Sequence, residues 1–196
     1  MKKLIICGAV IIFLIAGCNS NKKPGDVTIK GKDGETVTVN TGDYMEKAKE
    51  MKANMEELQK LKPLSMDEMK ALIPSEIMGT PQSGLEAVSF SGVSQASARY
   101  KINDSSKVKL SVMDCAGTAG AGIYNMRLLM NFEIDNENEY TKGSEFKGGK
   151  AVESCKKKRN DCSFTYFAGD RFMVVLDGDN IGIDKLKDIA GGLNIK

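Results

Sequence analysis

The feature that most constrains the fold is an alternation of apolar and polar residues that recurs in the C-terminal half of this 196-residue chain. Side chains of a β-strand point alternately to the two faces of a sheet, so a period of two predicts strands with one buried face. Six runs read as strands: 96–102, 108–112, 140–146, 150–155, 162–167 and 171–176. We therefore expect an α+β fold in which an antiparallel sheet of about six strands carries helices on one face.

The first two runs predict a hairpin around the polar turn at residues 103–106. Opposing Ile102 with Val108 and Tyr100 with Leu110 keeps the apolar side chains of both strands together. A hairpin in this register has one buried side and one solvent-exposed side.

Helical patterns accompany the strands. Residues 119–131 are apolar at helical spacing, and Asp184 is expected to cap a closing helix. Ser65 and Glu68 form a capping-box pattern that opens a short helix. The stretch 75–84, with two glycines and a proline, is expected to be an irregular connection.

An N-terminal β-hairpin is predicted over residues 27–40, where valine and isoleucine alternate with threonine and lysine. A three-residue loop at 32–34 would place Ile29 opposite Val37. A lone hairpin of this size is marginal in water, so we expect it to dock on the main domain or on a partner.

An amphipathic helix is predicted over residues 44–62. Its apolar seam includes Met51, Met55 and Leu58 at spacings of four and three. These three residues are candidate contacts for a partner, because methionine adapts to varied apolar surfaces. The alternative is that the seam packs on the chain's own domain.

The first 17 residues have the pattern of a secretory signal. Two lysines precede an apolar run over residues 4–15, and the small residues Ala16 and Gly17 precede Cys18. The run holds about a dozen residues, whereas a bilayer-spanning helix needs about 20. It is therefore too short to remain as a membrane anchor.

The segment Leu14-Ile15-Ala16-Gly17-Cys18 resembles the lipobox of bacterial lipoproteins. The resemblance implies cleavage before Cys18, diacylation of its sulfur and attachment to a membrane through that lipid. In a Gram-negative cell, the residue after the lipid-bearing cysteine, an asparagine, favours the outer membrane. The remainder is similar in style to small uncharacterised envelope lipoproteins and resembles no characterised family.

These patterns divide the chain into four segments. Residues 1–17 are the expected lipoprotein signal peptide, and residues 18–26 are a polar, lipid-anchored tether. Residues 27–62 hold the hairpin and the amphipathic helix. Residues 63–196 are expected to form one α+β globular domain.

Composition narrows the classes of function. The chain has 28 basic and 26 acidic residues, and Lys2 and Lys3 leave with the signal, so the mature chain is close to neutral. A nucleic-acid-binding protein would carry a net basic surface. The chain has no histidine, which excludes Ser-His-Asp and Cys-His hydrolases but does not exclude an enzyme that uses carboxylates, lysine or tyrosine. We expect no cofactor and no metal, because the glycine order of residues 117–122 does not match a dinucleotide or phosphate motif, and residues 177–182 match only the start of a calcium loop.

Three cysteines other than Cys18 remain after cleavage, in a compartment where disulfides persist. Cys155 and Cys162 flank an expected hairpin tip and could bond across it. The alternative is that Cys115 bonds to either of them. Cys115 as a nucleophile has no histidine to activate it.

A basic tip lies between the last two cysteines, at Lys156, Lys157, Lys158 and Arg159. It is a candidate contact for anionic lipid or another polyanion. A solvated hairpin tip is the alternative, because acidic residues lie nearby.

The sequence thus predicts a lipid-anchored protein of the cell envelope that acts as a binding or accessory module for an envelope protein, and not as an enzyme. One alternative is a carrier of a hydrophobic ligand, which requires a cavity between sheet and helices. Another is an envelope enzyme that uses carboxylates or lysine, or its helper subunit.

Overall fold

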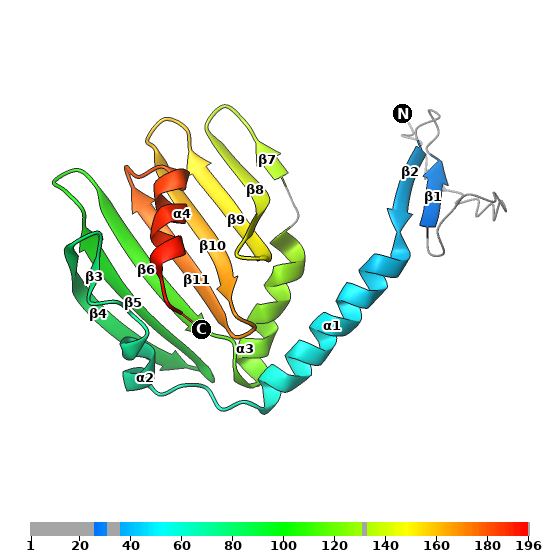
Figure 1. Cartoon of the computed structure of the whole chain (residues 1–196), viewed down its shortest axis with the longest axis horizontal. Coiled ribbons are helices and arrows are strands. Elements are labelled where there is room, and N and C mark those ends of the chain that lie inside the picture. Colours follow the sequence, from blue (N-terminus) through cyan, green and yellow to red (C-terminus); the bar gives the residue numbers. More distant parts are fainter. Residues whose placement is uncertain (1–25, 31–35, 131–132, 196) are drawn as a thin grey trace, which may run out of the picture. The chain divides into compact units, whose positions relative to one another are not determined.

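The computed structural model describes residues 26–30, 36–130 and 133–195, and the chain divides into two units, Met1–Ala48 and Lys49–Lys196 (Figure 1). In the first unit, β1 (Asp26–Lys30) pairs antiparallel with β2 (Thr36–Asn40). Ile29 lies opposite Val37, so the predicted register is confirmed. The expected loop at 32–34 and the signal and tether at 1–25 lie outside the described residues.

The second unit is an α+β fold built on one antiparallel sheet of nine strands, where the sequence predicted about six. The strands follow the order β3-β4-β5-β6-β11-β10-β9-β8-β7 (Figure 1). Their bounds are β3 (Glu76–Ile77), β4 (Thr80–Phe90), β5 (Val93–Lys101), β6 (Lys107–Asp114), β7 (Glu133–Asp135), β8 (Glu139–Phe146), β9 (Gly149–Lys156), β10 (Asp161–Ala168) and β11 (Phe172–Asp179).

The sequence pattern did not reveal β3, β4 and β7, because none of them has a long alternation of buried apolar and exposed polar residues. β3 and the first five residues of β4 lie in the stretch 75–84. The prediction that this stretch is irregular was wrong. A tight turn at Met78 and Gly79, both with positive φ, joins these two strands. Most of β4 is exposed, and β7 has only three residues, so neither shows an apolar alternation.

The predicted register of the β5–β6 hairpin is wrong by two residues. Tyr100 pairs with Val108, and Ala98 pairs with Leu110. The backbone N–H of Asn103 donates to the carbonyl of Ser106 within the turn, at 3.2 Å. A slip of two residues leaves every side chain on its original face, so the apolar pattern alone could not detect it.

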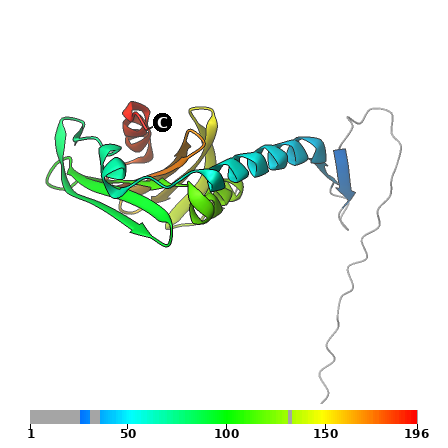
Figure 2. The ribbon, with the colours of Figure 1, turned by 90° about the horizontal axis from the view of Figure 1, so that it is seen from below.

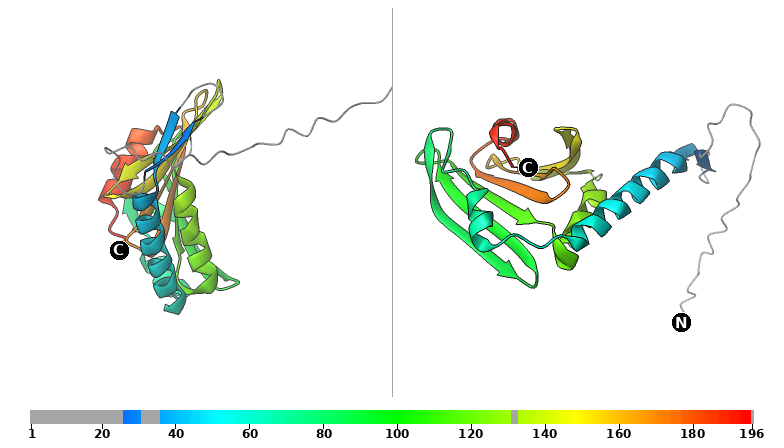
Figure 3. Two further views of the ribbon diagram at one scale, coloured as in Figure 1. Left: turned by 90° about the vertical axis from the view of Figure 1, so that its right-hand side faces the viewer. Right: turned by 60° about the horizontal axis from the view of Figure 1, so that its bottom comes forward.

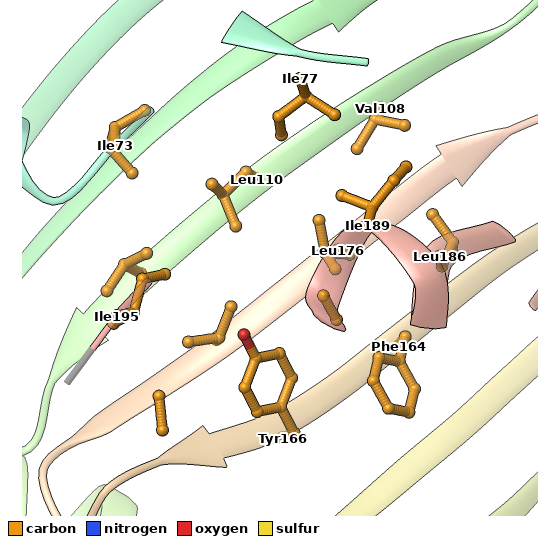
Figure 4. Packing of buried hydrophobic residues seen from close by; sticks show 14 of the residues in the cluster. Ile73, Ile77, Val108, Leu110, Phe164, Tyr166, Leu176, Leu186, Ile189 and Ile195 are labelled. Atoms are coloured by element: carbon orange, nitrogen blue, oxygen red, sulfur yellow. The ribbon is translucent and has the colours of Figure 1, made fainter. Parts of the chain in front are cut away.

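Helices lie on both faces of the sheet, and not on one face as predicted. On one face, α2 (Met66–Ala71) and α4 (Ile183–Gly192) pack on the larger core, and Figure 4 shows Leu186 and Ile189 of α4 over the strands. On the other face, α3 (Gly117–Tyr124), the 3-10 helix η1 (Asn125–Met130) and the end of α1 (Thr41–Lys60) surround a smaller cluster. Figures 2 and 3 show α3 and α4 on opposite sides of the sheet.

The helix ends only partly follow the sequence patterns. The capping box is confirmed, because the Ser65 N–H donates to the Glu68 carboxylate and the Glu68 N–H donates to the Ser65 hydroxyl. The expected cap at Asp184 is wrong, because the N-cap of α4 is Gly182, two residues earlier. Asp184 lies in the first turn instead, where the helix dipole favours a negative charge.

The loop between α1 and α2 is held against the sheet by a buried ion pair. Arg171, in the β10–β11 turn, donates two hydrogen bonds of 2.9 Å to the carboxylate of Asp114, at the end of β6. The backbone N–H groups of Leu64 and Ala116 donate to the same carboxylate, at 2.8 and 3.0 Å. Arg171 also donates to the carbonyl of Lys62 at 3.1 Å. Three segments that are distant in sequence therefore meet at one carboxylate.

The pKa of Asp114 gives the pH dependence of this contact. Burial alone would raise the pKa, but the hydrogen bonds from Arg171, Leu64 and Ala116 outweigh burial and hold the pKa below its ordinary value. The unfolded chain then binds the proton more readily than the folded chain. The stabilisation is complete above the unfolded pKa of about 3.9 and is lost as the pH falls through the lower folded pKa.

We predict that Arg171→Leu lowers the free energy of unfolding by about 3 kcal/mol at pH 7, because it leaves a buried carboxylate without its cation. Arg159→Leu is the matched control, since Arg159 pairs with Asp161 at 3.1 Å but is 76% exposed. The control should lose less than about 1 kcal/mol. Urea unfolding of the three proteins measures both values, and equal losses in the two variants would contradict the role given to Asp114.

Candidate functional site

A pocket of about 460 Å³ lies between the segment that follows α2 and the C-terminal end of α4. We call it the groove. Its lining residues are Ala71, Leu72, Pro74, Glu76, Ile77, Met78, Asp188, Ile189, Gly192, Leu193, Asn194 and Ile195. All of them belong to the second unit, on the side of the sheet that carries α2 and α4.

The first wall of the groove is anchored by buried residues on either side of Pro74. Ile73 and Ile77 are each 5% exposed and pack into the larger core (Figure 4). The hydroxyl of Tyr100, a fully buried residue on β5, donates to the carbonyl of Pro74 at 2.7 Å. This wall is therefore fixed to the sheet and is not a loose loop.

The second wall is α4, which lies along the sheet through one apolar face. Leu186 and Ile189 are buried against strand residues such as Leu176 and Phe164 (Figure 4). The ammonium group of Lys147 donates to the carbonyl oxygen of Ala190 at 3.2 Å, near the helix C-terminus. A cation at this end also complements the helix dipole.

An ion cluster holds the same helix to β8 and β9. Glu153 is buried among the apolar residues of β9, and its carboxylate lies 2.5 Å from the Lys187 ammonium on α4. Lys142 on β8 lies 3.7 Å from the other carboxylate oxygen. Burial alone would raise the pKa of Glu153, but the hydrogen bond and charge of Lys187, with the charge of Lys142, keep it lowered. The carboxylate is therefore ionised and fixes α4.

The groove has an apolar floor and an acidic rim. Ile77, Ile189 and Ile195 are buried, while Leu72 and Leu193 are half-buried and lie in the lining. The carboxylates of Glu76 and Asp188 are exposed, and neither forms an ion pair with another described residue. Such a site can take an apolar group and disfavours an anion.

The two expected disulfide partners lie directly opposite each other on β9 and β10. Cys155 pairs with Cys162, their Cα atoms are 4.1 Å apart, and the two sulfurs are bonded. Cys115 is not their partner, because it is a buried free thiol in the smaller cluster on the opposite face. Burial raises its pKa to about 11, so almost no thiolate is present at neutral pH.

The apolar seam of α1 packs on the chain's own domain. Leu58 is 3% exposed within the smaller cluster, and Met51 and Met55 pack against it. Polar contacts add to this packing, because Asn54 donates to the hydroxyl of Tyr124 at 3.4 Å. The structure thus shows the second of the two interpretations of these residues.

Acidic residues of nearby strands lie beside the basic tip. The Lys157 side chain pairs with Asp135, and its backbone N–H donates to the carbonyl of Asn138 at 2.7 Å. Arg159 pairs with Asp161, while Lys156 and Lys158 are exposed. Mixed charge at this tip weakens the case for a polyanion site.

In the glycine-rich stretch 117–122, Gly120 has a packing role. A Cβ atom at Gly120 would lie 2.5 Å from the backbone of Cys115, so glycine there permits close helix packing. Among residues 26–30, 36–130 and 133–195, no group of three acidic or cysteine side chains could hold a metal.

The sequence did not predict the groove, because its lining residues come together only in the folded chain. Ile77 and Leu193 are separated by more than a hundred residues, and the first lies in the stretch expected to be irregular. A local signal was present in Met78-Gly79, whose glycine suits a tight hairpin turn. Cys18, the expected lipidation site, lies outside the described residues.

Comparison with known proteins identifies no relative. No family model, curated protein or solved structure matches the chain. Within the part of the chain that the structure describes, no helix has the length and apolarity needed to cross a bilayer. The function must be inferred from the chain's own residues.

We predict that replacing both Cys155 and Cys162 with serine lowers the free energy of unfolding by about 2.5 kcal/mol, because the bond closes a short loop in the unfolded chain. Denaturant unfolding with and without dithiothreitol provides the control. The reductant should destabilise the wild type to the level of the double variant and leave the variant unchanged. A wild type whose stability is unaffected by full reduction would contradict this role.

Proposed function

We propose that the chain is a lipid-anchored protein of the bacterial cell envelope that binds an apolar ligand in the groove. The observation that carries the proposal is a pocket of about 460 Å³ with apolar lining and two fixed walls. Small-molecule sites are typically concave, mostly apolar and about 300–1,000 Å³ in volume. The groove therefore has the size and chemistry of a ligand site.

The rim of the groove narrows the ligand class. Glu76 and Asp188 place two carboxylates beside the apolar floor. They repel an anionic head group and tolerate a neutral or cationic one. The proposed ligand is thus an apolar molecule, or the apolar segment of an envelope protein, without negative charge near the bound part.

The placement of the perturbed carboxylates favours binding over catalysis. Hydrogen bonds from Ser65 lower the pKa of Glu68, and Asp114 and Glu153 are also lowered despite burial. None of these three acids lines the groove, and each is already engaged by a group of its own chain. A carboxylate enzyme would instead gather such groups in one cleft.

The proposed location of the protein in the cell envelope rests on its N-terminal sequence. A lipid on Cys18 and a short polar tether would hold the folded domain beside a membrane, where apolar ligands are concentrated. In a Gram-negative cell we propose the outer membrane. An accessory role for an envelope protein is the related alternative, in which the groove takes a segment of that protein.

We predict that Cys18→Ala releases the protein from lipid attachment, because the acylated sulfur is lost. The measurement is the incorporation of radiolabelled palmitate in growing cells, followed by separation of membrane and soluble fractions. Cys115→Ala is the control. It should still be labelled, because it retains Cys18 and removes only a buried thiol that is not expected to carry lipid. Labelling that persists in the Cys18→Ala variant would refute the anchor.

We predict that Leu193→Trp weakens the binding of the uncharged fluorescent probe N-phenyl-1-naphthylamine at least tenfold, because the indole fills the groove. Residues 19–196 serve for this titration, since they lack the lipid and need no detergent. Leu61→Trp is the control, because Leu61 is 43% exposed and does not line the groove. The control should bind the probe like the wild type.

Two outcomes would count against the groove as the binding site. The first is a wild type that does not bind the probe, and the second is binding that Leu193→Trp leaves unchanged. In the first case, crosslinking of the native lipoprotein in intact cells decides whether the accessory role holds. One dominant captured protein would support that role.

A further inference from the structure

The two edges of the nine-stranded sheet differ in how they are protected. β3 covers β4 only at Thr80 and Pro81, and the N–H of Gln82 then donates to the carbonyl of Ser75 at 2.8 Å. Beyond Gln82, no described residue forms a backbone hydrogen bond with the outer side of β4. Figure 1 shows β4 as the outermost strand where β3 has ended. Residues 83–90, which are eight of the eleven residues of the strand, therefore form an open edge.

The side chains on this edge are unusually apolar. Val88 is 54% exposed and Phe90 is 80% exposed, and both point to the face opposite the larger core. Glu86 is the single charged residue of the open segment. Natural proteins normally protect an edge strand with charges, prolines or a cover, since an open apolar edge pairs with other chains.

The opposite edge has that protection. β7 has only three residues, two of which are acidic. The β8 strand behind it carries Glu139, Lys142 and Glu145, and it pairs with β7 at three positions. The open segment of β4 has a single charged residue, Glu86, and this distinguishes one edge of the sheet from the other.

We propose that β4 pairs antiparallel with β4 of a second copy of this chain, about a twofold axis at Val88. After the irregular step between Ser83 and Glu86, the strand is regular from Glu86 to Phe90, and Val88 is the middle residue of that segment. In an antiparallel pairing of a strand with its own copy, one residue lies opposite itself. An axis at Val88 uses the whole regular segment of both copies.

The segment is complementary to itself in this register. Val88 of one copy lies opposite Val88 of the other, and each Phe90 lies diagonal to the second copy's Val88, within reach of an aromatic ring. The two Glu86 side chains lie on either side of the axis, each opposite a Phe90. Like charges are thus separated, the apolar residues meet, and the interface closes without leaving the edge free for a third chain.

The first test measures the molar mass of the full chain by light scattering after gel filtration in a mild detergent. Val88→Lys should convert a dimer into a monomer, because two ammonium groups would meet at the axis. Ile134→Lys is the matched control, since Ile134 is 51% exposed on the opposite edge strand β7 and should leave the dimer intact. A cooperative thermal unfolding transition in each variant shows that both fold.

Three results would overturn the proposal. One is a wild type that remains monomeric as its concentration is raised, and another is a dimer that survives Val88→Lys. The third is loss of the dimer with Ile134→Lys, because that would place both edges in a head-to-tail contact and not in a twofold one.

The second test locates the axis. Val88→Cys in the full chain should form a disulfide between two copies in cells, because opposite residues of antiparallel strands have Cα atoms about 4.5–5.5 Å apart. A band of doubled mass that disappears on reduction is the expected result. Ser105→Cys is the control, since Ser105 is exposed in the β5–β6 turn and should give no such band. Absence of the band in Val88→Cys, or an equal band in the control, would overturn the strand pairing.

Discussion

The fold of the second unit depends on one long-range pairing, that of β6 with β11. The chain forms β4 to β6 as one meander and β7 to β11 as another, with α3 and η1 between them. Among the described strands, β6 and β11 alone join the two meanders, through eight residue pairs that run from Phe172 opposite Asp114 to Asp179 opposite Lys107. Closing such a long loop costs chain entropy. The fully buried side chains that meet there, such as Leu110 and Leu176, offset that cost.

The groove is a consequence of this pairing. α2 precedes the first meander, and α4 follows the last strand of the second. The two helices share one face of one sheet because β11 lies beside β6. The Asp114–Arg171 pair adds a polar contact at the same junction, because Asp114 ends β6 and Arg171 immediately precedes β11. A loss of the β6–β11 pairing would therefore separate the walls of the groove.

Features of the fold that depend on residues close together in the sequence could be predicted. Features that depend on residues far apart in the sequence could not. The register at Ile29 and Val37, and the capping box at Ser65, depend on residues a few positions apart. The β5–β6 register was missed by two residues because a polar turn can close at several lengths, while the apolar alternation is unchanged by an even shift. β4 was missed because an exposed edge strand needs no buried face.

The candidate sites show the same division. The disulfide between Cys155 and Cys162 was among the pairings predicted from the sequence, because the two cysteines flank a short hairpin tip. The groove and the open edge of β4 arise from the order of strands in the sheet, and no local pattern encodes that order. Residue spacing also could not decide whether the apolar seam of α1 packs on the chain's own domain or on a partner. The two arrangements require the same periodicity of apolar residues.

Native-state hydrogen exchange of the backbone amides tests the dependence on the β6–β11 pairing most directly. The account predicts that hydrogen-bonded amides in β6 and β11 exchange slowest, with a free energy of opening equal to that of global unfolding. In the monomeric Val88→Lys variant, the outer part of β4 should exchange fastest among the strands of the sheet. Exchange of the two meanders as separate units, with amides of β6 and β11 opening before either meander unfolds, would contradict the account.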